Sequence, residues 1–262
     1  MPAVAANKAS STQTFNKQLA SSNRQTRDQA LERLRLYLGR STAFTPLDCL
    51  KLWKGLFYCM FMSDKPLNQQ RLARNLAGLV DVLTTRENTL NFIEGFWKIM
   101  SREWNAIDSL RLDKYLYLIR CYVRKGFELC LSTRGQKWKL NDDYLAILRD
   151  DGGPLNSRDP KVPVGLRLHV LDTWVDELDK EDTSRTALVE TFIAPLRDLA
   201  KETLTTSVRK RVKETLEDER LEDWKNEKVP EKTDDDGKDV NMQDRPNQVD
   251  EGENADFEGF DD

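Results

Sequence analysis

Residues 108–131 read DSLRLDKYLYLIRCYVRKGFELCL, and their apolar members recur at helical spacing on more than one face of the helix that they predict. These apolar residues are Leu110, Leu112, Tyr115, Leu116, Leu118, Ile119, Tyr122, Val123 and Phe127. A surface helix carries a single apolar stripe, whereas a helix that is apolar nearly all round is buried among other elements. We therefore expect this helix to lie at the centre of the fold.

Helical spacing continues on both sides of this stretch, over most of residues 14–228. We expect one helix to end near Gly39, the next to begin at Pro46, and others to cover residues 69–83, 88–100, 142–148, 166–178, 188–204 and 208–224. Glycine (12) and proline (9) are few, which disfavours a turn-rich all-β fold. The expected fold class is all-α, with irregular HEAT- or armadillo-like stacked helical hairpins forming an α-solenoid. Because no repeat of fixed period is visible, a compact helical bundle is the alternative.

The two ends of the chain differ from this helical region in composition. Residues 1–13 are small and polar, and residues 230–262 hold thirteen acidic side chains against three basic ones. Such segments bury too little apolar surface to order themselves. We expect a disordered N-terminus (1–13), a helical-repeat domain (14–228, with a loop near 150–165) and an acidic disordered tail (229–262). The longest apolar run, residues 56–62, is too short to cross a membrane, and no signal peptide is visible.

The net charge of −4 conceals a strong asymmetry between the two halves. Residues 1–140 carry 23 Lys and Arg against 11 Asp and Glu, a net of +12, and residues 141–262 carry 18 against 34, a net of −16. An excess of positive charge over half a chain favours a polyanion or an acidic protein as partner. The candidate RNA- or partner-binding residues are Lys51, Lys54, Lys65, Arg102, Arg111, Lys114, Arg120, Arg124, Lys125, Arg134, Lys137 and Lys139. Taken one at a time, each position favours a solvated helix face or a salt bridge, and only the excess over the whole half favours a partner.

Catalytic motifs are not visible in the chain. There is one histidine, His169, on a predicted apolar helix where it is more often packed than catalytic. No phosphate-binding loop or dinucleotide fingerprint occurs. The four cysteines lie in apolar runs, as reduced and buried thiols do. We expect no catalytic residue, metal, cofactor, small-molecule substrate or membrane contact.

Several stretches resemble the ribosomal RNA processing protein 1 family, over roughly residues 14–215. The most recognisable are LWKGLFYCM at 52–60 with MSDKP at 62–66, then FW at 96–97, REW at 102–104, ID at 107–108 and LRLDKY at 110–115. Further similarity lies in FNKQLA at 15–20 with Asn23 and LERL at 31–34, and in VP at 162–163, GL at 165–166, His169 and DEL at 176–178.

The resemblance implies a nuclear, nucleolar assembly factor that scaffolds early pre-60S particles without catalysis. Family members are needed to process the precursor of the 5.8S and 25S/28S rRNAs. The implied partners are pre-60S assembly factors, ribosomal proteins and large-subunit pre-rRNA, with this chain monomeric inside a large complex. Its short acidic tail resembles the compact fungal form rather than the animal form with long basic extensions. The alternatives are a protein-only adaptor that docks an acidic partner without touching RNA, and a nuclease acting on pre-rRNA.

The stretch at residues 52–66 also has an interpretation from its own periodicity. Trp53, Leu56, Phe57 and Met60 share one helix face and should be buried, while Lys51 and Lys54 emerge at the other edge. Asp64 is positioned to cap the next helix, with Pro66 in its first turn.

Overall fold

The computed structural model describes residues 17–18, 21–131 and 140–226. The chain divides into two units, residues 1–227 and 228–262, and every described residue belongs to the first. The segments expected to be disordered, residues 1–13 and 229–262, lie outside the described residues. The division of the chain into those three parts therefore stays a prediction.

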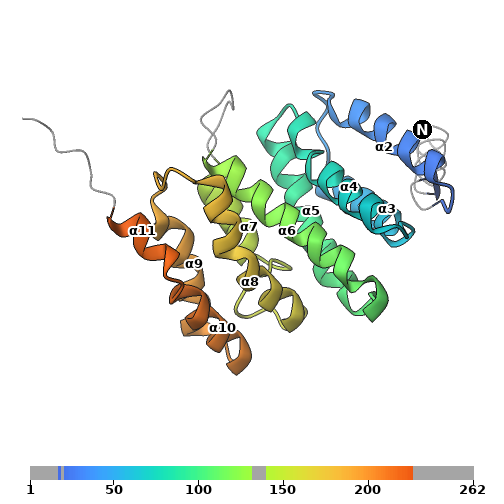
Figure 1. The fold of residues 1–262 in the computed structure, drawn as a ribbon. Coiled ribbons are helices and arrows are strands. Elements are labelled where there is room, and N and C mark those ends of the chain that lie inside the picture. The colour runs from blue at the N-terminus through green and yellow to red at the C-terminus, as the bar shows by residue number, and fades with distance from the viewer. Residues whose placement is uncertain (1–16, 19–20, 132–139, 227–262) are drawn as a thin grey trace, which may run out of the picture. The chain divides into compact units, whose positions relative to one another are not determined.

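The described part of the chain is helical, without a strand (Figure 1). Its α-helices are α2 (Arg24–Leu38), α3 (Pro46–Phe61), α4 (Pro66–Ala77), α5 (Arg86–Glu103), α6 (Ser109–Leu131), α7 (Asn141–Arg149), α8 (Val164–Glu181), α9 (Val189–Glu202), α10 (Thr206–Leu216) and α11 (Arg220–Asn226). Two 3₁₀ turns, η1 (Val80–Val82) and η2 (Trp104–Ala106), follow α4 and α5. The expected all-α class is confirmed.

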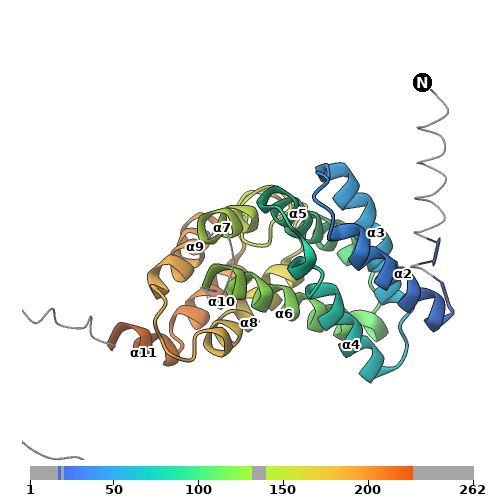
Figure 2. The same ribbon diagram turned by 90° about the horizontal axis from the view of Figure 1, so that it is seen from above.

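Eight of these helices form four stacked hairpins, α3–α4, α5–α6, α7–α8 and α9–α10, in two layers (Figure 2). The first helices of the hairpins pack in the order α3, α5, α7, α9, and the second helices in the order α4, α6, α8, α10. This arrangement is the stacking of helical hairpins that defines a solenoid. The expected solenoid is therefore confirmed, and the bundle alternative is wrong.

Helix α6 lies at the centre, as expected, and contacts α3, α4, α7 and α8. Two of its buried tyrosines bind carbonyl groups on neighbouring helices: the Tyr115 hydroxyl donates to Phe57 O at 2.9 Å, and the Tyr122 hydroxyl donates to Leu76 O at 3.0 Å. Each hydroxyl satisfies its own hydrogen bond within the core and fixes the position of α6 along its neighbour.

The predicted core side of α3 is confirmed, because Trp53, Leu56, Phe57 and Met60 are each at most 2% exposed. The Trp53 indole donates to Phe92 O at 2.8 Å, which ties α3 to α5. Helix α3 begins with a capping box between Thr45 and Asp48, which the sequence interpretation did not identify.

The predicted cap of α4 is wrong. Helix α4 begins at Pro66 rather than at residue 69, so Lys65 is its N-cap residue and Asp64 lies one position too early. A residue before proline is held in extended conformation, and this places the helix boundary directly at Pro66. No side chain caps α4.

The prediction of a single helix over residues 208–224 is also wrong, because the helix is interrupted between α10 and α11.

The four cysteines are free thiols, of which Cys49, Cys59 and Cys130 are buried and Cys121 is half-buried. Burial raises the pKa of the first three thiols to about 12 and that of Cys121 to about 11. Protonated, enclosed thiols are poor nucleophiles, which agrees with a structural role. No helix of the described residues is long and apolar enough to cross a membrane.

Gly126 allows α7 to lie against α6. A Cβ atom added at Gly126 would overlap the ring and hydroxyl of Tyr144, which is fully buried on α7. We predict that Gly126→Ala lowers the free energy of unfolding by about 1–3 kcal/mol, because the core must shift to accept one methyl group. Urea denaturation measures the change.

Gly78→Ala is the matched control, since its added Cβ meets no atom closer than 3.4 Å. The smaller variant Tyr144→Leu should restore part of the stability lost in Gly126→Ala, giving a positive coupling in a double-mutant cycle. Equal effects of Gly126→Ala in both backgrounds would contradict the proposed contact.

Candidate nucleic-acid interface

The exposed side of α3 carries cations and aromatic rings in a continuous strip. Lys51, Lys54 and Tyr58 follow one another at intervals of three and four residues, on the face opposite Trp53. Lys51 and Tyr58 are exposed, and Lys54 is partly exposed. Phe61, at the end of the helix, is half-buried.

Cation–ring and ring–ring contacts connect these side chains to the start of α6. The Lys54 ammonium lies 5.2 Å from the centre of the Tyr58 ring, and the rings of Tyr58 and Phe61 are 6.3 Å apart. The Arg111 guanidinium lies 4.3 Å from the centre of the Phe61 ring. We call Lys51, Lys54, Tyr58, Phe61 and Arg111 the α3 strip.

Two more of the predicted residues border the α3 strip. Glu103, at the end of α5, pairs with Lys54 at 2.6 Å and with Arg102 at 2.8 Å, while Arg102 stays more than half exposed. Lys65, at the turn into α4, is exposed. Lys51 and Lys65 form no ion pair with any residue in the described part of the chain. Their charges are therefore available to an external anion.

Lys114 is buried and belongs to the fold rather than to this surface. Its ammonium donates to Phe61 O at 2.7 Å and to Ser63 O at 2.8 Å, where α3 ends. Burial, followed by the charge of Arg111, lowers the pKa of Lys114 to about 8. The side chain thus satisfies the Phe61 carbonyl, which has no partner within α3, and shares Ser63 O with the Gln69 side chain.

The three predicted cations in the middle of α6 are also committed to internal pairs. Arg120 binds Asp176 at 2.9 Å and also Glu177, whose side chain is 3% exposed. Arg124 pairs with Glu181, one turn further along α8. Lys125 pairs with Asp81 at 3.1 Å and with Glu128 at 2.6 Å. Two of these three cations, Arg120 and Arg124, therefore have carboxylate partners on α8, in the acidic half of the chain.

We predict that Arg120→Ala lowers the free energy of unfolding by about 1.5–3 kcal/mol, because it removes charged hydrogen bonds to the buried Glu177. Lys51→Ala removes an exposed cation that forms no ion pair with a described residue, and it should change the free energy of unfolding by less than about 0.5 kcal/mol. Urea denaturation of the two variants at low and at moderate salt measures both values. Equal stability of the two variants would show that the α6–α8 pairs contribute nothing.

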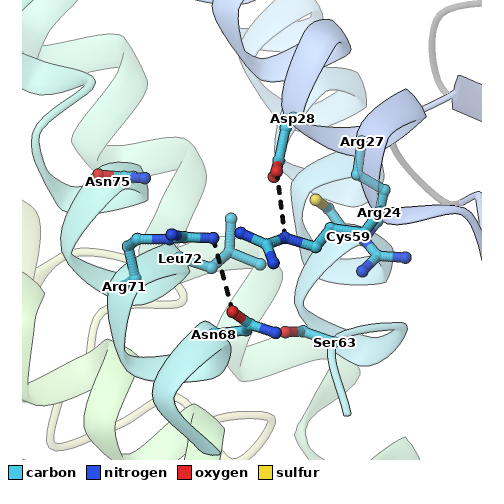
Figure 3. A pocket seen from close by; sticks show the side chains of 9 residues that line it. All are labelled: Arg24, Arg27, Asp28, Cys59, Ser63, Asn68, Arg71, Leu72 and Asn75. Atoms are coloured by element: carbon cyan, nitrogen blue, oxygen red, sulfur yellow. Dashed lines mark hydrogen bonds and ion pairs between the residues drawn. The ribbon is translucent and has the colours of Figure 1, made fainter. Parts of the chain in front are cut away.

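The sequence interpretation missed a polar groove between α2 and α4 (Figure 3). Arg24 of α2 and Arg71 of α4 extend toward one another in it, and Asn68 and Asn75 line its α4 side. Arg24 pairs with Asp28 at 3.3 Å, whereas Arg71 donates to the Asn68 amide oxygen at 3.5 Å. Within the described part of the chain, the groove therefore presents the Arg71 guanidinium without a carboxylate partner. The basic excess over the first half was the only sequence signal for it.

Three of the predicted residues, Arg134, Lys137 and Lys139, lie outside the described residues. His169 is packed, with its Nε2 atom 2.8 Å from Leu116 O, and burial lowers its pKa. Within the described ranges, no group of three or more His, Cys, Asp or Glu is arranged to hold a metal ion.

Residues 10–259 match the family described as "Nucleolar protein, Nop52". The chain is a member of this family. The match covers the described helices, the α3 strip and the groove between α2 and α4. The resemblance found in the sequence is confirmed, and so is the expected nucleolar localisation.

Curated relatives of the Nop52-family chain come from several animals. Over 171 residues it is 40% identical to human Ribosomal RNA processing protein 1 homolog B, and this alignment covers 63% of this chain and 22% of the human protein. Over 197 residues it is 36% identical to mouse Ribosomal RNA processing protein 1 homolog A, and that alignment covers 72% of this chain and 39% of the mouse protein. The Caenorhabditis elegans homolog is 33% identical over 170 residues, covering 63% and 41%. The chain thus spans less than half the length of these relatives.

Proposed function

We propose that this chain takes part in ribosomal RNA processing as a non-enzymatic scaffold of early nucleolar pre-60S particles. Membership of a nucleolar family supports the setting, and the relatives named for ribosomal RNA processing support the process. The partners in this proposal are pre-60S assembly factors, ribosomal proteins and the precursor of the 5.8S and 25S/28S rRNAs.

The α3 strip is the observation that supports direct contact with RNA. Proteins that bind unpaired RNA combine cations that follow the phosphate backbone with exposed aromatic rings on which bases stack. Tyr58 is 39% exposed beside Lys54, and the unpaired Lys51 lies one turn away. Arg111 continues the same arrangement on Phe61. We propose that unpaired pre-rRNA lies along this strip.

The neighbouring unpaired cations extend the proposed contact over the first hairpin. Lys65 lies in its turn, and Arg71 projects into the groove between α2 and α4. Lys54 and Arg111 also pair with carboxylates, Glu103 and Asp108, but each lies beside an aromatic ring of the α3 strip. Arg120, Arg124 and Lys125 are held by carboxylates outside the strip, so we leave them out of the proposed RNA contact.

We predict that the double variant Lys51→Glu/Lys65→Glu weakens binding of the full chain to fragments of large-subunit pre-rRNA at least tenfold at about 0.1 M salt. Two lost phosphate contacts should also reduce the slope of log affinity against log salt by about 1.4. Tyr58→Ala should weaken binding by about 1–3 kcal/mol with the slope unchanged, because stacking releases no counterions. Fluorescence anisotropy over a salt series separates the two effects.

Lys201→Glu/Lys210→Glu is the charge-matched control, at exposed cations on α9 and α10, of which Lys210 makes a surface pair with Glu214 at 3.7 Å. An equal loss of affinity in the control would mean that only net charge matters. If the wild-type chain binds no pre-rRNA while Lys51→Glu/Lys65→Glu still releases it from pre-60S particles, the protein-only adaptor is correct. Cleavage of the RNA by the purified chain in magnesium would contradict a non-enzymatic role.

A further inference from the structure

The second helices of the four hairpins run parallel to one another, so their N-termini meet at one edge (Figure 1). Arg74 of α4 binds the Tyr117 hydroxyl of α6 at 3.0 Å, and His169 of α8 binds Leu116 O at 2.8 Å. Thr215 of α10 binds Leu171 O of α8 at 3.4 Å. The offsets of these contacts place Leu67, Leu110 and Val164 at nearly the same level. Residue 208 of α10 is level with Val164, so Leu204 lies just beyond this level, ahead of α10.

Each of these four helix starts exposes an aliphatic side chain. Leu67 is the second residue of α4 and Leu110 the second residue of α6, and they are 81% and 93% exposed. Val164 is the first residue of α8, 41% exposed, and Leu204, two residues before α10, is 93% exposed. Single exposed leucines are ordinary on a protein surface. Three of the four side chains lie in the first two residues of their helices and Leu204 lies just before α10, and we call these four side chains the N-terminal row.

The first turns of the helices in this row are also distinctive in charge. Acidic residues at a helix N-terminus are favourable because they complement the positive end of the helix dipole. The first helix of every hairpin follows this rule, with Asp48, Glu87, Asp142 and Glu190 in the first turns of α3, α5, α7 and α9. The second helix of every hairpin, α4, α6, α8 or α10, has no acidic residue there.

The first backbone N–H groups of three of these helices donate no hydrogen bond to a capping side chain. No side chain caps α4, α8 or α10. Asp108 does cap α6, but its carboxylate is paired with Arg111. Lys65 and Lys161 add exposed positive charge before α4 and α8, and Asp64 adds one exposed negative charge. The edge therefore combines exposed aliphatic side chains with three uncapped helix ends of positive potential, those of α4, α8 and α10.

We propose that the N-terminal row docks an acidic protein segment that bears an apolar side chain at each repeat of the row. Packed helices lie about 8–10 Å apart, so the aliphatic side chains recur at about that spacing. A partner helix advances about 10 Å in seven residues, and an extended segment does so in three. Carboxylates between the apolar residues of the partner would face the uncapped helix ends.

A protein segment fits this edge better than RNA does. RNA phosphates are met by Lys and Arg, and bases by aromatic rings, as on the α3 strip. The N-terminal row instead places an aliphatic group at each positive helix end, and aliphatic groups gain affinity only by burial against another apolar surface. The aliphatic side chains of the row are thus distinct from the residues of the α3 strip, although Lys65 borders both surfaces.

The test uses the full chain and synthetic 24-residue peptides rich in Glu, with Leu at every seventh position for a helical probe or every third for an extended one. We expect one of them to bind at micromolar concentrations, and the variant Leu67→Ser/Leu110→Ser/Leu204→Ser to weaken it at least tenfold. The matched control is Leu36→Ser/Leu47→Ser/Leu188→Ser, three leucines that are 57–80% exposed elsewhere. The control should bind within twofold of the wild type.

Peptides with Lys in place of Glu, or with Ser in place of Leu, should fail to bind. The proposal is overturned if neither acidic peptide binds below about 1 mM, or if both triple variants lose affinity equally. It is also overturned if the row variant reduces binding of pre-rRNA and leaves peptide binding unchanged, because the row is then an RNA surface. Urea denaturation of both triple variants confirms that they remain folded, as expected for substitutions at exposed positions.

Discussion

The packing of α6 against helices on several sides is the constraint on which the other described helices depend. Tyr115 and Tyr122 bind carbonyl groups of α3 and α4, and Gly126 leaves space for the ring of Tyr144 on α7. Arg120 links α6 to its remaining neighbour, α8, through ion pairs with Asp176 and Glu177. A helix held at so many points sets the position of the hairpins before and after it. The α3 strip and the N-terminal row both inherit their geometry from this arrangement.

Cations of the basic half serve two separate purposes. Arg120 and Arg124 on α6 pair with carboxylates of α8, so part of the positive charge of the basic half is neutralised inside the structure. Lys51 and Lys65, on the first hairpin, have no such partner among the described residues and remain exposed. The net charge of a segment therefore overstates its electrostatic attraction for RNA. What matters for a partner is the charge left over after folding.

The four hairpins are alike in architecture although no repeat of fixed period is visible in the sequence. Their connections and helices differ in length, as α6 with 23 residues and α7 with 9 show. What recurs is the packing order and the chemistry of the helix starts: acidic first turns on one layer, exposed aliphatic residues on the other. Such recurrence becomes visible only when the helices are placed side by side. It suggests two surfaces, one suited to RNA and one to protein, on a single scaffold.

Periodicity in the sequence determined the all-α class, the central position of α6 and the burial of Trp53, Leu56, Phe57 and Met60, because these depend on residues within a few turns of one another. It also indicated that Lys51 and Lys54 emerge from α3. The tertiary structure alone decided that Lys114 is buried, that Arg120 and Arg124 are paired, and that Arg24 and Arg71 share a groove. The partners in those contacts lie more than forty residues apart in the chain. No local pattern encodes such a separation; only the parallel register of the stacked hairpins creates it.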